Sequence, residues 1–231
     1  MTPYTQTYSP SAFNTSELYR VNREIIFYLS YFNKWENKSY YTKVLELGCG
    51  RGNLTYDLFN TFKNDINTYS ILDSDVELIG ETLKKVNGFQ TIMPIVINND
   101  MNNNLNLDKN NYNLVVTSLS IHHVQNKEQL FKQIYNSLTN NGLFVIGDIF
   151  DSEDNNELNF VNFIRDTILQ QQLVSDSDRN ERDKHRKKES RESINQYINY
   201  LKKASFHKIY LLYKHINTSI LIALKEQADE N

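Results

Sequence analysis

The chain has 231 residues, of which 39% are hydrophobic and 23% charged, and a formal net charge of −3. These values are typical of a soluble globular protein with a substantial core, and they give no overall positive charge that would favour nucleic acid. No apolar run approaches the roughly 20 residues that cross a bilayer. The N-terminus also lacks the basic segment followed by an apolar segment that is typical of a secretion signal. We therefore expect a cytoplasmic protein without a membrane partner. The single cysteine excludes an intramolecular disulfide and a cysteine-cluster metal site, so the sequence identifies no metal ligands and leaves a metal requirement open.

The chain opens with a predicted irregular arm and an amphipathic helix, together residues 1–40. Apolar residues recur at helical spacing between Ser16, a candidate N-cap, and Trp35. This helix precedes the first predicted strand, and its apolar face can pack on the sheet.

A short apolar strand, a tight turn and a helix are predicted between Lys43 and Phe62. Glu46 stands near the end of the strand. Three glycines then follow at alternate positions: Gly48, Gly50 and Gly52. Glycine is needed where a chain leaves a buried strand with positive φ, or where a ligand lies against the backbone. The spacing departs from the G-x-G-x-x-G fingerprint and no Lys-Ser/Thr pair follows, so a phosphate-carrying ligand is disfavoured.

Acidic residues follow the next two predicted strands. The second strand ends at Asp73, which lies 21 positions beyond Gly52, close to the separation of about 20 at which an acidic residue binds ribose hydroxyls. A carboxylate suits this task because it accepts two hydrogen bonds from a diol. The third strand, Thr91–Asn98, is followed by Asp100 and Met101. Either acid could instead cap a helix or face solvent.

Two adjacent histidines follow the fourth predicted strand, Leu114–Thr117. In an open α/β sheet, ligands bind beyond the carboxyl ends of the strands where the strand order reverses. His122 and His123 fall in that place, where a neutral imidazole could remove a proton from a hydroxyl or an amine. The alternative is that both histidines are structural and that orientation of the reactants suffices.

The second half of the chain predicts a helix over Lys127–Leu138, a turn at Asn140–Gly142 and a fifth strand over Leu143–Asp148. Asp148 could orient a substrate amine or a histidine. A helix over Ile194–Ala204 and two apolar strands, 209–213 and 219–224, close the chain.

Residues 151–193 are predicted to form a helical and charged insertion. Within it, residues 179–191 carry seven Lys or Arg residues against three acidic ones. Such a run is usually a solvated helix or loop, and its alternatives are a lid over a substrate or a patch for RNA phosphates. The lack of interleaved aromatic residues counts against nucleic acid.

The pattern Glu46-x-Gly48-x-Gly50-x-Gly52 resembles motif I of the class I S-adenosylmethionine-dependent methyltransferases, and the resemblance extends over residues 40–225. It implies a Rossmann-like α/β fold, a three-layer sandwich around a mostly parallel seven-stranded sheet with an antiparallel C-terminal strand. It also implies S-adenosyl-L-methionine as cofactor and S-adenosyl-L-homocysteine as product. Family members usually carry Asp where Asn113 stands, at the start of the fourth strand and away from the ligand edge.

The resemblance also implies roles for individual residues. The expected cofactor contacts are Glu46, Gly48, Cys49, Gly50, Gly52, Asp73, Ser74, Asp100, Met101 and Ser118. Glu46 and the glycine turn would hold the methionine portion, Asp73 the ribose and Asp100 the adenine. His122 or His123 would act as the catalytic base.

We therefore expect a single methyltransferase domain over residues 1–231, with 1–40 covering the site and 151–193 able to act as a lid. The expected reaction is methyl transfer to an oxygen or nitrogen atom of a small-molecule acceptor. Two alternatives stay open: an RNA-modifying enzyme of the same fold, such as one acting on tRNA, and a non-catalytic cofactor-binding protein. The sequence leaves the oligomeric state open.

Overall fold

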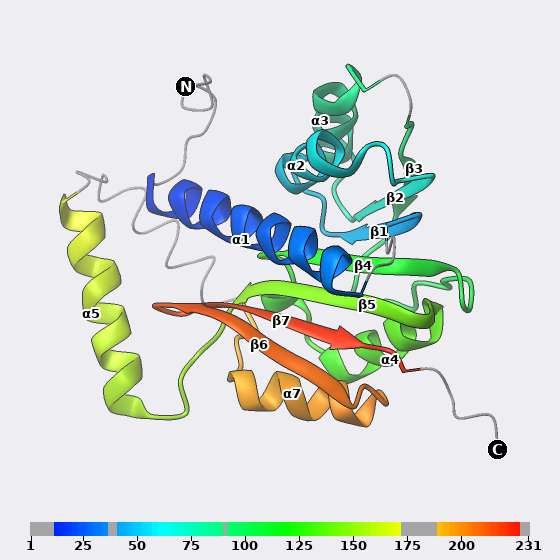
Figure 1. Cartoon of the computed structure of the whole chain (residues 1–231). Coiled ribbons are helices and arrows are strands. Elements are labelled where there is room, and N and C mark those ends of the chain that lie inside the picture. The colour runs from blue at the N-terminus through cyan, green and yellow to red at the C-terminus, as the bar shows by residue number, and fades with distance from the viewer. Residues whose placement is uncertain (1–11, 37–40, 90–91, 172–188, 227–231) are drawn as a thin grey trace.

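The computed structural model describes residues 12–36, 41–89, 92–171 and 189–226 (Figure 1). In chain order the described elements are α1 (Ala12–Glu36), β1 (Lys43–Leu47), α2 (Asn53–Phe62), β2 (Thr68–Asp73), α3 (Val76–Val86), β3 (Ile95–Asn98), β4 (Tyr112–Ser118), the 3-10 helix η1 (Ile121–His123), α4 (Lys127–Ser137), β5 (Leu138–Ile149), α5 (Asn155–Gln171), α7 (Ile194–Lys203), β6 (Lys208–His215) and β7 (Thr218–Leu224). Within these ranges, no helix combines the length and the apolar character needed to span a membrane.

All seven strands form one sheet in the order β3-β2-β1-β4-β5-β7-β6. The strands β1 to β5 pair in parallel, whereas β7 lies antiparallel to both β5 and β6. The predicted sheet with its inserted antiparallel strand is thereby confirmed. Because β1 lies between β2 and β4, the strand order reverses at β1 and β4, where ligands bind in open α/β sheets.

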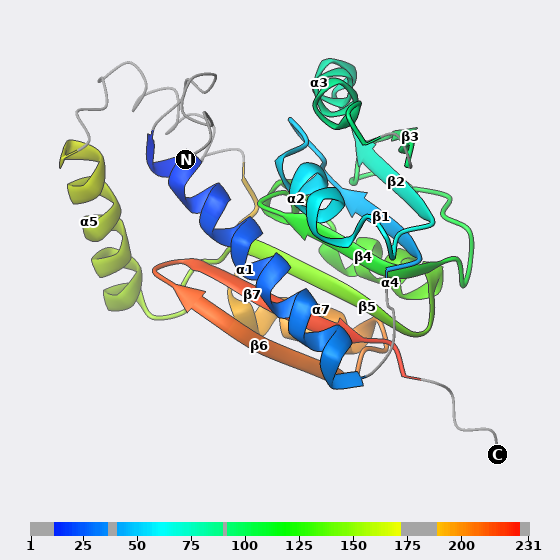
Figure 2. The same ribbon diagram turned by 45° about the horizontal axis from the view of Figure 1, so that its top comes forward.

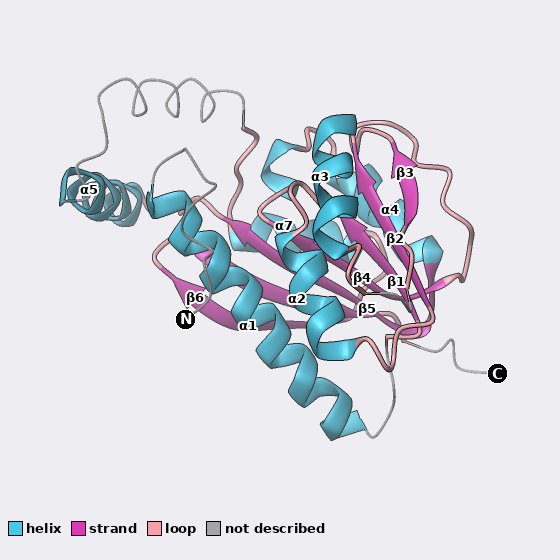
Figure 3. Ribbon diagram, turned by 90° about the horizontal axis from the view of Figure 1, so that it is seen from above, coloured by secondary structure: helices cyan, strands magenta, loops and turns pink. Residues whose placement is uncertain are grey.

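Two apolar cores cover the two faces of the sheet, which makes the three predicted layers. Along β4, Leu114 and Val116 face the core under α1, α2 and α3, while Val115 faces the core under α4 and α7. Strand side chains alternate between faces, so these apolar runs are buried on both sides. Figure 3 shows the first group of helices over one face of the strands.

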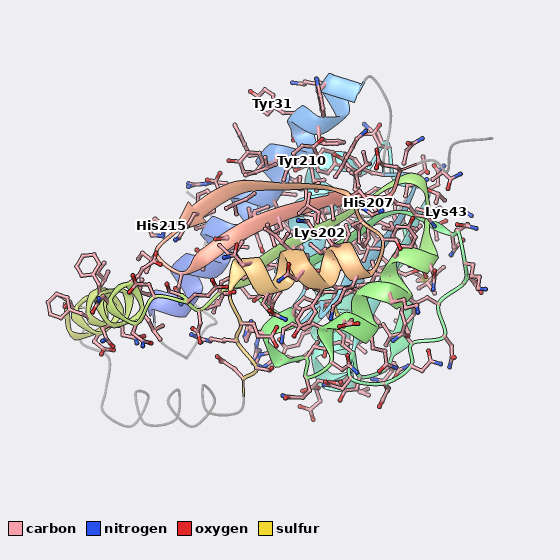
Figure 4. The ribbon with its side chains drawn as sticks, turned by 90° about the horizontal axis from the view of Figure 1, so that it is seen from below. Tyr31, Lys43, Lys202, His207, Tyr210 and His215 are labelled. Atoms are coloured by element: carbon pink, nitrogen blue, oxygen red, sulfur yellow. The ribbon has the colours of Figure 1, made fainter. Side chains whose placement is uncertain are left out.

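The carboxyl ends of the parallel strands define one edge of the sheet. Figure 4 places Lys43, the first residue of β1, and His215, the last residue of β6, at opposite ends of the sheet. α5 extends beyond the end of the sheet at which β6 ends (Figure 2). The glycine turn, η1 and the β6–β7 turn therefore lie along the same carboxyl edge.

Several predicted boundaries were wrong. Helix α1 begins at Ala12, so Ser16 is inside the helix and is not its N-cap. Strand β3 covers only Ile95–Asn98, while residue 91, the first of the predicted strand, lies outside the described residues.

The predicted turn at Asn140–Gly142 lies within β5, which begins at Leu138. Its pairing with β4 shifts register between Tyr112 and Leu114, and Asn141 has a φ of 62° there. A bulge with one left-handed residue lets the ladder resume after the interruption. The turn residues were thus recognised, but their effect was a bulge rather than a strand end.

The charged run is mostly outside the structural description. Residues 172–188 are not among the described residues, so the solvated, lid and RNA interpretations of 179–191 stay predictions. Residues 189–193 are described as an irregular segment that leads into α7. This segment contributes to the site.

Candidate functional site

The glycine turn has the backbone conformation that its sequence predicts. Gly48, Gly50 and Gly52 have φ values of 68°, 52° and 70°. A Cβ at Gly48 would come within 2.6 Å of Ser120 Cβ, and one at Gly52 within 2.9 Å of Thr82. Nothing lies within 4 Å of a Cβ placed at Gly50. Two glycines therefore permit close packing of the turn, and the third leaves bare backbone against open space.

Asp73 lies beside this turn at the end of β2. Its Oδ2 accepts a hydrogen bond from Gly50 N at 2.8 Å, and its Oδ1 accepts one from Asp75 N at 3.0 Å. A carboxylate has about four acceptor positions, so two remain for a diol. The next residue, Ser74, is exposed, and its carbonyl oxygen accepts a hydrogen bond from Asn98 Nδ2 at 3.2 Å. The structure thus places Asp73 in contact with the glycine turn, with Ser74 directly after it.

Glu46 lies beneath the turn and is only 1% exposed. Its Oε2 accepts hydrogen bonds from Thr55 Oγ1 and Tyr69 Oη, both at 2.6 Å. Burial raises the pKa of Glu46 to about 7, against the lowering effect of these two hydrogen bonds. The observed contacts anchor β1 to α2 and β2, and the direct cofactor contact of Glu46 stays a prediction.

The raised pKa of Glu46 predicts a pH-dependent stability. The folded protein holds this proton up to about pH 7, whereas the unfolded chain releases it near 4.5, so the free energy of unfolding falls as pH rises between these values. The full difference corresponds to about 3 kcal/mol. Glu46→Gln keeps an acceptor oxygen but cannot ionise, so we expect its free energy of unfolding to lack this decrease. Urea unfolding at pH 5 and pH 8 measures the free energy of unfolding of both proteins.

The matched control for this experiment is Glu77→Gln, since Glu77 is exposed on α3. This variant should keep the pH dependence of the parent protein. An equal pH dependence in the parent and in Glu46→Gln would show that the buried carboxyl does not titrate as described.

Cys49 is buried between the two first glycines of the turn. Thr82 Oγ1 lies 3.7 Å from its Sγ. Burial, followed by the negative charge of Glu46, raises the pKa of Cys49 to about 12. The side chain is therefore a thiol at neutral pH and does not supply a nucleophile.

Asp100 and Met101 follow β3 at the same edge. Asp100 is exposed, and its Oδ1 accepts hydrogen bonds from the backbone and side-chain nitrogens of Asn102 at 2.8 and 3.0 Å. Met101 points to the turn, because a Cβ at Gly48 would lie 3.6 Å from its Cε. The two residues offer a carboxylate and an apolar surface beside the glycine turn.

Ser118 ends β4 and contacts the N-terminal helix. Its Oγ donates a hydrogen bond of 2.7 Å to Oδ1 of Asn22, which is fully buried on α1. Asn22 was not among the predicted site residues, because amphipathic spacing identifies the buried face of a helix but not which polar residue on it reaches a site.

His122 is held by Asp148, the residue that the sequence offered as its orienting partner. Its Nδ1 lies 2.5 Å from Asp148 Oδ1, and its backbone N donates to Asp148 Oδ2 at 2.9 Å. The two side chains are 6% and 0% exposed. A carboxylate only accepts hydrogen bonds, so Nδ1 carries the hydrogen and Nε2 is the basic nitrogen of the neutral ring.

Residues 189–191 cover the other side of His122. Glu189 Oε1 lies 3.9 Å from His122 Nε2, which is beyond hydrogen-bond reach, and Glu189 Oε2 lies 2.5 Å from Arg191 Nε. Ser190 N donates to the His122 carbonyl oxygen at 2.7 Å. Burial raises the pKa of Glu189, but the charges of Arg191 and His122 outweigh it and lower the pKa overall. Residues 189–191 were not predicted to lie in the site, because they belong to the charged run 179–191, which is typical of a solvated segment.

His123 is the outer member of the pair. Its side chain is exposed, and its ring centroid lies 4.1 Å from that of His122. Desolvation by the surrounding protein, and then the charge of His122, lowers the pKa of His123. Its ring is therefore neutral at neutral pH. Among the residues described, no group of three or more His, Cys, Asp or Glu side chains could hold a metal ion.

A comparison with protein families matches residues 45–144 to the model of a methyltransferase domain. This range contains the glycine turn, Asp73, Asp100 and both histidines. A search of curated protein sequences gives no match.

Solved structures with the same fold include several methyltransferases. The YcgJ protein from Bacillus subtilis shares 9% identity over 91% of this chain and 100% of its own, with a TM-score of 0.59. Phosphoethanolamine N-methyltransferase 2 from Haemonchus contortus, solved with phosphomonomethylethanolamine and S-adenosylhomocysteine, shares 12% identity over 88% of this chain and 53% of its own, with a TM-score of 0.61. The CurJ carbon methyltransferase shares 13% identity over 81% of this chain and 49% of its own, with a TM-score of 0.59. The chain spans about half the length of the last two proteins.

Proposed function

The chain contains a methyltransferase domain of the class I, S-adenosylmethionine-dependent type, and we propose that it transfers a methyl group to an oxygen or nitrogen atom of a small molecule. The observation that carries this proposal is the pairing of His122 with Asp148 beyond β4, beside a glycine turn that is bonded to Asp73. A base with an orienting carboxylate serves acceptors that must lose a proton. The proposal takes residues 1–231 as one domain in the cytoplasm, with residues 151–193 as a lid.

The residues present fit the cofactor of this family. The bare backbone at Gly50 offers the close approach that the amino-acid end of the ligand needs. Asp73 and Ser74 would hold the ribose, while Asp100 and Met101 would contact the adenine. When bound, S-adenosylmethionine supplies a methyl group on a sulfonium, which is already a strong electrophile.

The chain's own residues then have three tasks. The carboxyl edge must place the acceptor atom in line with the methyl group and exclude water. His122 Nε2 takes the proton that the acceptor atom loses. Asp148, bonded to Nδ1, holds the ring in the required tautomer and stabilises the imidazolium that forms.

Asp73→Ala is expected to weaken S-adenosylhomocysteine binding at least tenfold, or about 1.4 kcal/mol. The substitution removes the ribose acceptor and the hydrogen bond that fixes Gly50 N. Isothermal titration calorimetry gives the dissociation constants. Asp65→Ala, at an exposed position beyond α2, is the control and should bind like the parent protein. Equal affinities of Asp73→Ala and the parent would remove Asp73 from the site.

Methyl-labelled S-adenosylmethionine tests the acceptor class. The purified protein is incubated with a collection of small hydroxyl and amine compounds and, separately, with total RNA. The proposal predicts label in the small-molecule fraction. Label in RNA, with a rate that falls steeply as salt rises, would favour the RNA-modifying alternative. Cofactor binding without transfer to any acceptor would favour the non-catalytic one.

A further inference from the structure

A second feature of the carboxyl edge is a pocket of about 360 Å³ beside the histidine site. It is bounded by the segment after β5, by α5, by the start of α7 and by the β6–β7 turn. The pocket shares two chain segments with the histidine site, because Phe150 follows Asp148 by two residues and Ser193 follows Arg191 by two. Its volume lies at the lower end of the range of about 300–1,000 Å³ for small-ligand sites.

The charge of the pocket lining is negative. Four carboxylates and one ammonium group line it: Asp151, Glu153, Asp154, Glu157 and Lys214. The pKa values of Glu153 and Glu157 are lowered, chiefly by hydrogen bonds from Ser193 and from Lys214, so both side chains are ionised at neutral pH.

Three of the four carboxylates have partners within the protein. Glu153 accepts from Asn195 Nδ2 at 3.1 Å, Glu157 pairs with Lys214 at 2.8 Å, and Asp154 caps α5 at 2.7 Å through Asn156 N. Capping and pairing explain these three side chains. Asp151 differs from them, because the structure gives its carboxylate no partner among the described residues, although its backbone N donates to Glu192 at 3.1 Å.

A buried hydroxyl provides an independent observation. Ser219 lines the pocket, is only 1% exposed, and its Oγ has no hydrogen-bond partner among the described residues. It pairs in register with Asp148 across β5 and β7. A buried hydroxyl without a partner costs free energy unless a ligand or water satisfies it. Apolar side chains of Phe150, Leu158 and Leu211 complete the walls.

We propose that this pocket binds an alkylammonium group of the methyl acceptor, with Asp151 as counter-ion and Ser219 as hydrogen-bond acceptor. A primary ammonium has three donors and no acceptor, which matches a carboxylate and a hydroxyl that line one pocket without partners among the described residues. Apolar walls contact its carbon chain. An ammonium held in its charged form has no lone pair to attack a methyl group, so it anchors the acceptor while another atom of the same molecule reacts.

This inference rests on the proposed function for the identity of the ligand, but it can be tested without turnover. The probe is n-butylammonium chloride, titrated into ¹⁵N-labelled full-length protein and followed through the backbone amides of Asp151, Asn195 and Asn217. The expected result is saturable shifts of these amides. Sodium butyrate and n-butanol at matched ionic strength should give at least tenfold weaker binding.

Three variants sharpen the test. Asp151→Asn should weaken n-butylammonium binding at least tenfold, and Leu158→Trp, which fills the pocket without changing charge, should abolish it. Asp166→Asn is the matched control, because Asp166 is exposed on the same helix, α5, and does not line the pocket. It should bind within twofold of the parent. Amide spectra of each variant report whether it is folded, and either pocket variant suffices for the test.

Equal binding of butyrate and n-butylammonium would overturn the proposal, as would parental affinity in Asp151→Asn or Leu158→Trp. A parallel titration with S-adenosylhomocysteine separates the two claims. Binding of n-butylammonium without binding of S-adenosylhomocysteine would contradict the proposed function and support the ammonium pocket. Binding of S-adenosylhomocysteine without binding of n-butylammonium would contradict the pocket and leave the proposed function supported.

Discussion

Gly48→Ala is expected to weaken S-adenosylhomocysteine binding by at least a hundredfold. Gly48 has a φ of 68°, where any side chain is strained, and the added Cβ would come 2.6 Å from Ser120 Cβ. Ser120 directly precedes η1, so relief of this overlap must displace the turn or the segment that carries His122 and His123. Calorimetry measures the affinity, and thermal unfolding shows whether the variant is folded at the temperature used.

Two other glycines serve as graded controls. Gly80 lies within α3 and a Cβ there would meet nothing within 4 Å, so Gly80→Ala should bind like the parent and gain about 0.5–1 kcal/mol of stability. Gly50 also has open space but a φ of 52°, so Gly50→Ala should show a smaller loss than Gly48→Ala. If Gly48→Ala and Gly80→Ala bound equally well, close packing of the turn would have no role in the site.

His122→Gln is expected to lower the rate of methyl transfer by about 10²–10⁴-fold, the usual contribution of a positioned general base. The affinity for S-adenosylhomocysteine should change less than twofold, because the base contacts the acceptor and not the cofactor. Single-turnover rates with saturating cofactor measure the chemical step once an acceptor is known.

Asp148→Asn should lower the same rate by a comparable factor. An asparagine can turn its NH₂ group toward Nδ1, which would place the ring hydrogen on Nε2 and remove the basic nitrogen. His123→Gln is the matched control, since its ring is exposed and has no carboxylate partner at hydrogen-bond distance among the described residues; a loss below tenfold is expected. Equal losses in His122→Gln and His123→Gln would contradict the assignment of the base to His122.

Local rules were sufficient to predict most of the fold. Positive φ at alternate glycines, apolar strands of five to seven residues and the position of Asp73 depend on short-range chemistry. The insertion of β7 between β5 and β6 was implied by the family resemblance alone. Spacing predicted only a hairpin, because strand order in a sheet depends on contacts between distant segments.

The parts of the site that escaped prediction depend on tertiary contacts. Asn22 reaches Ser118 across 96 residues of chain, and Glu189 lies near His122 although 67 positions separate them. No local pattern marks such residues: Asn22 stands on an ordinary amphipathic helix, and Glu189 stands in a charged run that resembles a solvated segment. The pocket containing Asp151 and Ser219 is likewise formed by three separate segments.

The central claim is that the glycine turn and Asp73 form a site for S-adenosylmethionine. Calorimetric titration of S-adenosylhomocysteine into the parent protein tests it most directly, because the product analogue needs neither an acceptor nor a catalytic base. The account predicts one site per chain with a micromolar dissociation constant. A folded parent protein that gives no heat of binding with either S-adenosylhomocysteine or S-adenosylmethionine, and no stabilisation by them in thermal unfolding, would contradict it.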